Sequence, residues 1–325
     1  MVAIIELLRD GVACKLGAKN PFSGAGRPLE GLDVTGTTVA RVGVPWLLQA
    51  SGKFMNDYEY RIMREVEDSF WWYVTLHQAV VAEVQGAMAG RARSRVLDAG
   101  CGTGGMLERL RQTEPGWSCS GLDFSEGALA HARARGLVEL RQGSVDALPY
   151  ADASFDVVVS LDVLYFAGVD EARAMKEFYR VLKPGGVLVL NLPAFEVLRG
   201  EHDAAVHGVR RYTPARVRQM LSACALEDQR TWCWNLWLFL PVLCWRWLSR
   251  WRLAARTRMA GEETAKSDLT MPPGPVNALL KAMARLDFVL CQWIRAPLGT
   301  SVFSVGRKPE SRRPDPDVEN LSRAL

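Results

Sequence analysis

A glycine-rich turn beside a carboxylate is the part of this 325-residue sequence with the clearest chemical potential. Gly100, Gly102 and Gly105 form the turn. It follows a short apolar run at 96–99, in which Asp98 stands. Glycines at such a turn let a ligand approach the backbone closely, because no Cβ is in the way. The helix expected after the turn would offer free N–H groups, so the spacing predicts a cofactor site.

Two carboxylates lie near this turn, and one of them separates the classes of cofactor that the turn could bind. The spacing G-x-G-x-x-G also occurs where dinucleotides bind. Asp98 would repel the pyrophosphate of a dinucleotide, but it would attract a ligand that carries ammonium and sulfonium groups. Asp123 ends the next apolar segment and can accept hydrogen bonds from the ribose hydroxyls of either cofactor. Asp98 therefore favours a cationic ligand, and an NAD(P) site stays open as the alternative.

Apolar runs that alternate with helical stretches must position these residues. Strands are expected at 96–99, 138–142, 155–161, 187–192, 227–232 and 301–305, with another that ends at Asp123. Helices are expected over 58–88, 105–112, 125–135, 170–182 and 213–223. Continuous apolar strands between helices are typical of a parallel sheet covered on both faces. The predicted fold class is α/β: a doubly wound, Rossmann-like seven-stranded sheet with a helical insertion before the last strand.

Changes in pattern along the chain predict six segments. They are an N-terminal extension (1–54), a helical lid (55–90), the cofactor-binding core (91–232), a hydrophobic and basic helical insertion (233–298), the last core strand (299–307) and a charged, Pro-rich tail (308–325). The tail is expected to be disordered. The aromatic cluster at 70–73 either packs on the core or covers the cofactor or acceptor pocket.

The run at 96–105 resembles motif I of class I S-adenosylmethionine (SAM)-dependent methyltransferases of the type 11 kind. Four further segments, 121–125, 143–150, 155–158 and 182–186, match landmarks of that family in order. The resemblance implies SAM as the cofactor, bound by Asp98, Gly100, Cys101, Gly102, Asp123, Phe124, Ser144, Val145 and Leu161. Ser144 stands where the family commonly has Asp. Its hydroxyl accepts a hydrogen bond from adenine less strongly, so some loss of affinity is expected.

Catalytic candidates should follow the fourth and fifth strands, at the carboxyl edge of the sheet. They are Asp162, His202, His207 and Arg211. A His with a near-neutral pKa suits the deprotonation of a hydroxyl or carboxylic acid acceptor. The segment around His202 shows limited similarity to ubiquinone-biosynthesis O-methyltransferases. The alternative is structural: His202 and Arg211 would tie a loop to the next helix, and Asp162 would cap a turn.

The insertion contains an apolar, Trp-rich stretch that is followed by arginines, at 232–258. Trp and Arg around a short apolar segment are typical of a helix at a membrane surface. A second apolar helix with basic residues is expected at 276–294. The alternatives are a lid packed on the core and a dimer contact. Lid and membrane helix both favour a hydrophobic acceptor.

Composition bounds the remaining functions. A net charge of +4 is too small for nucleic acid as the main partner. The seven cysteines are scattered without C-x-x-C spacing, which predicts no metal site or disulfide framework. The N-terminus has no basic signal-peptide region, so a cytoplasmic protein is expected, peripheral at the inner face of a membrane if the insertion binds lipid. The predicted function is SAM-dependent O-methylation of a lipophilic small molecule or lipid-linked acceptor; N- or C-methylation, an oxidoreductase and a non-catalytic scaffold stay open.

Overall fold

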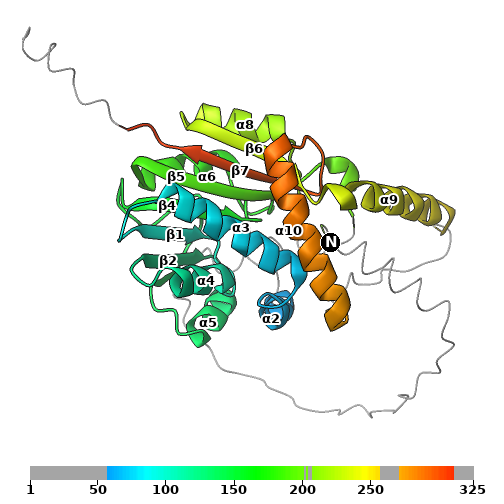
Figure 1. Ribbon diagram of the computed structural model, residues 1–325, viewed down its shortest axis with the longest axis horizontal. Helices are drawn as coiled ribbons and strands as arrows, with labels where there is room; N and C mark the ends of the chain where they lie inside the picture. The colour runs from blue at the N-terminus through cyan, green and yellow to red at the C-terminus, as the bar shows by residue number, and fades with distance from the viewer. Residues whose placement is uncertain (1–56, 201–202, 204–206, 257–270, 311–325) are drawn as a thin grey trace, which may run out of the picture.

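A seven-stranded sheet organises the chain in the computed structural model, which describes residues 57–200, 203, 207–256 and 271–310 (Figure 1). The strands are β1 (Arg95–Ala99), β2 (Ser118–Asp123), β3 (Leu140–Gln142), β4 (Phe155–Leu161), β5 (Leu182–Pro193), β6 (Glu227–Trp234) and β7 (Ser301–Arg307). They lie in the order β3-β2-β1-β4-β5-β7-β6. The predicted α/β class and the seven strands are confirmed.

One strand departs from the predicted parallel arrangement. β7 lies between β5 and β6 and pairs antiparallel with both. The two helices of the insertion, of 21 residues each, return the chain to the end of β6. Ser301 at the start of β7 therefore pairs with Trp234 at the end of β6, and β7 runs back along β6. Ordered chain also continues past β7: the Lys308 ammonium donates to the carbonyls of Tyr179 and Leu182, both at 2.7 Å, so the predicted tail boundary is too early.

Helices cover both faces of the sheet. They are α2 (Asp57–Val66), α3 (Trp71–Ala87), α4 (Gly105–Thr113), α5 (Glu126–Ala134), α6 (Glu171–Val181), the 3-10 turn η1 (Glu196–Leu198), α8 (Pro214–Ala223), α9 (Leu236–Arg256) and α10 (Gly274–Ile294). Strand side chains alternate between two cores, as the pleat requires. Leu97 and Val158 pack with α6 and α8 on one face. Val96 and Val157 pack with α3, α4 and α10 on the other.

The stretch predicted as one helix over 58–88 is two helices, with a turn between α2 and α3. Phe70 precedes α3 in extended conformation and is fully buried. Burying this side chain in the cluster under α9 and α10 requires a break in the helix. The break sets α2 apart from α3, and the contacts of α2 are with α5.

The insertion is anchored to the sheet by its aromatic residues and by one carboxylate. Trp232 and Trp234 belong to β6, are buried, and contact Phe288 of α10 with ring centroids 5.7 and 5.5 Å apart. The Asp287 carboxylate accepts hydrogen bonds from the backbone N–H groups of Asn235 (2.6 Å) and Leu236 (3.0 Å), at the start of α9. A side chain of α10 therefore caps α9. Over the described residues, we find no helix with the length and apolarity to cross a membrane.

Replacing Asp287 by Ala should lower the free energy of unfolding by about 1–2 kcal/mol, because the first N–H groups of α9 lose their acceptor. Urea denaturation followed by circular dichroism measures this loss. Glu139→Ala is the matched control, since Glu139 is an exposed carboxylate before β3, and a change within about 0.5 kcal/mol is expected. Equal stability of the two variants would contradict the capping role of Asp287.

Candidate active site

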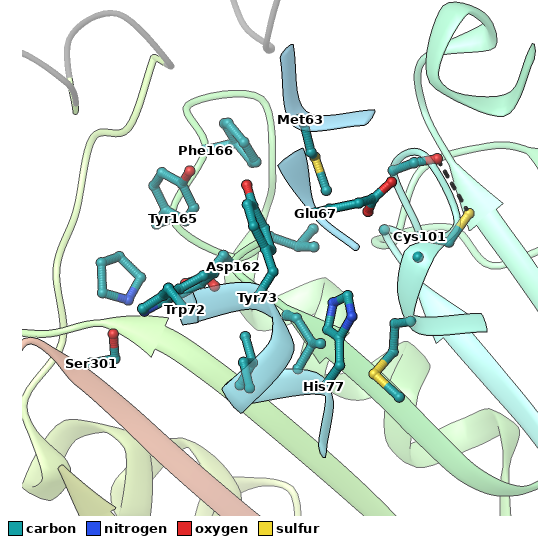
Figure 2. A pocket seen from close by; sticks show the side chains of 18 of the residues that line it. Met63, Glu67, Trp72, Tyr73, His77, Cys101, Asp162, Tyr165, Phe166 and Ser301 are labelled. Carbon is teal, nitrogen blue, oxygen red and sulfur yellow. Dashed lines mark hydrogen bonds between the residues drawn. The ribbon is translucent and has the colours of Figure 1, made fainter. Parts of the chain in front are cut away.

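A cavity opens at the carboxyl ends of β1, β2, β4 and β5 (Figure 2). The nine residues predicted to bind the cofactor come from four separate segments, and all of them line this cavity: Asp98, Gly100, Cys101, Gly102, Asp123, Phe124, Ser144, Val145 and Leu161. The structure therefore brings the whole predicted cofactor set to one place. Their individual roles stay predictions.

The glycine turn is fixed by β2 and by its own lack of side chains. The N–H groups of Gly100 and Cys101 both donate to the Leu122 carbonyl, at 2.7 and 2.9 Å. Gly100 has a φ of 90°, and a Cβ there would lie 2.2 Å from a methyl of Val163. A side chain at this position would push the turn away from the β4 edge. Glycine thus keeps the backbone of the turn exposed to the cavity, as a close-fitting ligand requires.

Two buried carboxylates face the turn. Asp98 is 2% exposed, and none of the described residues donates a hydrogen bond to it. Burial, with the charges of Asp123 and Glu67 nearby, raises the pKa of Asp98 to about 8. Burial also raises the pKa of Asp123, while the N–H groups of Ser125 and Gly102 that donate to it act in the opposite direction. This surplus of acidic groups fits a cationic ligand and disfavours a pyrophosphate.

A buried ion pair holds α2 over the turn. Arg135, after α5, donates to Glu67 at the end of α2, and both side chains are 1% exposed. The Thr103 hydroxyl donates to the same carboxylate, and Arg135 Nε donates to the Thr103 carbonyl at 2.9 Å. α2 consequently forms a wall of the cavity, with Met63 next to Gly102 and the Tyr60 hydroxyl within reach of Asp123. Residues of the segment predicted to be a lid therefore line the cavity, and closure by that segment stays a prediction.

Aromatic side chains surround Asp162 in the second half of the cavity, where Figure 2 shows Trp72, Tyr73, Tyr165 and Phe166. Asp162 directly follows β4 with a φ of 54°. Burial raises the pKa of its carboxyl to about 7. The amide of Asn191 donates to Asp162 Oδ2 at 2.8 Å, and the indole of Trp234 donates to Asn191 Oδ1 at 2.9 Å. The indole of Trp234 thus orients the Asn191 amide, and the amide in turn orients the Asp162 carboxyl.

The other predicted catalytic residues have different positions. Arg211 lines the cavity, but its guanidinium donates to both oxygens of Asp203, at 2.9 and 3.0 Å, and to the Ala194 carbonyl at 2.9 Å. His207 is not among the residues that line the cavity. It has a φ of 54°, and the next residue, Gly208, forms a β-bridge with Phe166 in the loop after β4. His202 lies outside the described residues. The structural alternative for Arg211 is therefore the better supported one.

His77 and Asn235 are among the polar residues of the cavity that were not predicted from the sequence. His77 of α3 is buried, and burial together with Arg109 lowers its pKa to about 3, so its imidazole is neutral. Asn235 is fully buried, and its side-chain amide makes no hydrogen bond within the described part of the chain. It interrupts the apolar run at the start of α9, and that interruption was the one available signal.

Comparison with known proteins agrees with this geometry. A model of the methyltransferase domain family matches residues 97–190, from the glycine turn to β5. A probable SAM-dependent methyltransferase of Mycolicibacterium smegmatis is 32% identical over 168 residues, which is 51% of this chain and 62% of that protein. The demethylmenaquinone methyltransferase of Thermus thermophilus is 41% identical over 106 residues, 31% of this chain and 47% of that protein. Residues 97–190 are therefore similar to the methyltransferase domain family, and the relatives that match this part of the chain are named as methyltransferases.

The Mycolicibacterium smegmatis relative is named for SAM, which is the cofactor that the sequence predicts for this cavity. The fold of the chain is similar to that of a phosphoethanolamine N-methyltransferase 2 of Haemonchus contortus, which was solved with SAM. The TM-score is 0.51 and the sequence identity 17%, over 78% of this chain and 58% of the other. The chain spans only about half to two thirds of the length of the two relatives above. The acceptor must accordingly be inferred from the cavity of this chain.

Asp98→Asn should weaken SAM binding about 10- to 100-fold, because the carboxylate that meets the cation becomes neutral. In the wild type, affinity should rise between pH 6 and 8, since binding of the cation below pH 8 must also remove a proton from Asp98. The variant should lose this pH dependence. Isothermal titration calorimetry with SAM measures both effects, and Asp228→Asn serves as the exposed control. Saturable binding of NADH in place of SAM would contradict the assignment.

Proposed function

We propose that this protein is a SAM-dependent methyltransferase that transfers the methyl group to an oxygen of a hydrophobic small molecule or a lipid-linked acceptor. The observation that carries the proposal is the position of Asp162: a buried carboxyl with a pKa of about 7 stands between the cofactor residues and an aromatic wall. This is the place in the cavity at which an acceptor hydroxyl would have to lose its proton.

The composition of the wall supports a hydrophobic acceptor. Trp71 and Leu198 line the cavity with Leu238 and Val242 of α9, and they belong to one apolar cluster that α10 completes. Apolar walls with a few polar groups are typical of sites for lipophilic ligands. The Thermus thermophilus relative is named for a quinone acceptor, but its likeness to this chain covers only 106 residues. The argument for the acceptor class therefore rests on the wall.

Asp162 supports transfer to oxygen. SAM, when bound, supplies a methyl group activated by a sulfonium. A neutral hydroxyl attacks such a carbon poorly and needs a base that takes its proton. A carboxyl whose pKa is near 7 is partly ionised at neutral pH and can accept that proton. The Asn191 amide holds the carboxylate in place, and the aromatic side chains around it keep bulk water away.

Asp162→Asn should lower kcat about 100- to 10,000-fold and leave the Kd for SAM unchanged, because only the base is lost. In the wild type, kcat should rise with pH through about 7 as Asp162 ionises, and this rise should disappear in the variant. Acceptors can be found by following labelled methyl groups from SAM into organic-extractable products of catechols, hydroxybenzoates and prenylated phenols. Wild-type turnover in the Asp162 variant would overturn this role.

His202 provides the competing candidate for the base, and the same assay separates the two. If Asp162 is the base, His202→Ala should keep kcat within about threefold of the wild type, since the carboxylate would still take the proton. Loss of turnover in His202→Ala, with full turnover in Asp162→Asn, would assign the proton transfer to the histidine. Tight SAM binding in both variants shows that the fold is retained.

A further inference from the structure

Helix α10 has two apolar faces, of which only one is buried. Leu280, Ala284 and Phe288 pack against α3, β6 and α9. On the opposite side six apolar residues are exposed to solvent: Val276 (37%), Leu279 (60%), Met283 (38%), Leu286 (62%), Leu290 (49%) and Trp293 (82%). We call these six residues the outer face of α10.

The outer face is continuous along the helix. Its members are spaced by three or four residues, so they lie on one side of a helix with 3.6 residues per turn. Ala278, Ala282, Val289 and Ile294 flank it and are also exposed. At 100° per residue, the uncharged sector covers roughly 160° of the circumference. A helix side that faces only water normally carries charged residues there, so this sector requires an apolar partner.

The charges of the insertion restrict what that partner can be. The sequence of α9 contains Arg246, Arg250, Arg252 and Arg256 and no acidic residue. α10 adds Lys281 and Arg285 and a single acid, Asp287, whose carboxylate caps α9. Arg246 is 8% exposed and lines the cavity, so it is left out of the comparison. The sequence of the two helices then has five basic residues against one acid, and this net positive charge favours a negatively charged partner.

Exposed tryptophans at two places fit the boundary of a lipid bilayer. Trp293 ends the outer face of α10, and Trp247 of α9 is 60% exposed. Indole rings prefer the headgroup level of a membrane, and basic side chains beside them reach the lipid phosphates. On α9, Leu240 is 64% exposed as well. An apolar sector, exposed indoles and surplus positive charge together describe a surface that lies on anionic lipid.

We infer that the outer face of α10 binds the surface of an anionic membrane. A second copy of the chain fits less well, because a two-helix seam is a narrow stripe with charged residues at its margins. Along one margin of the outer face stand Ala278, Ala282 and Val289, which would widen a contact with lipid and supply no charge pairing.

This binding mode deepens the proposed function, and that part of the inference rests on it. The buried face of α10 shares one apolar cluster with Leu238 and Val242, which line the acceptor half of the cavity. In Figure 1, α10 crosses the sheet face beside α3, with α9 next to it. The helix proposed to touch lipid therefore packs in the same apolar cluster as the α9 residues that line the acceptor half of the cavity, which would bring a lipophilic acceptor close to its site.

The test is sedimentation of the full-length protein with sucrose-loaded vesicles of phosphatidylcholine, with or without 30% phosphatidylglycerol as a chosen composition, roughly that of an anionic leaflet. Wild type should pellet with the anionic vesicles, and 0.5 M salt, roughly three times physiological ionic strength, should weaken the binding. Leu286→Glu and Trp293→Glu should each weaken it at least about tenfold, since a charge enters the lipid contact. Val138→Glu is the matched control, because Val138 is an 86% exposed apolar residue before β3.

Three results would overturn the inference: no sedimentation of the wild type, unchanged binding of the Leu286 and Trp293 variants, or equal loss in the Val138 variant. Light scattering without lipid tests the competing partner, and a dimer that Leu286→Glu dissociates would assign the outer face to a second copy. SAM titration of each variant excludes loss of the fold. Vesicle binding without any methyl transfer would refute the proposed function and leave the membrane surface intact.

Discussion

Burial of negative charge at the end of β1 is the constraint on which the rest of this site depends. Asp98 and Asp123 lie within the sheet edge, and both are almost inaccessible to water. Transfer of a carboxylate from water into such surroundings is costly unless a cation or hydrogen-bond donors compensate it. Asp123 has backbone donors from the turn, whereas Asp98 has none in the described chain. The protein thus contains a carboxyl whose charge a cationic cofactor can compensate.

The third carboxylate, Glu67, shows how the same problem is solved within the protein. Arg135 and the Thr103 hydroxyl both donate to it, so the charge is paired and hydrogen-bonded. Breaking such a pair leaves an uncompensated buried charge, which makes it a strong constraint on geometry even where its net contribution to stability is small. Because Thr103 belongs to the glycine turn, the position of α2 is coupled directly to the cofactor site.

The cofactor half could be predicted from the sequence because its residues follow strands, and parallel strands end at a common edge. Local patterns sufficed for Gly100 and Asp123. They did not suffice for Glu67 and Arg135, which are 68 residues apart and meet only through packing of α2. The antiparallel β7 was missed for a similar reason, since its direction depends on how α9 and α10 return the chain. Trp234 was placed in the insertion, two residues beyond the predicted end of the sixth strand, and burial against Phe288 places it in the core.

The acceptor half depends on contacts between segments that no local pattern links. Asp162 is oriented by Asn191 of β5, which is oriented in turn by Trp234 of β6. Directly after Trp234 the chain enters α9, whose first N–H groups are held by Asp287 of α10. Hydrogen bonds and the covalent link from Trp234 to Asn235 therefore connect the Asp162 carboxyl to α10, the helix that carries the outer face. The hydrogen bond between Trp234 and Asn191 is buried, so a shift of Trp234 would leave the Asn191 amide little room to adjust and would change its contact with Asp162.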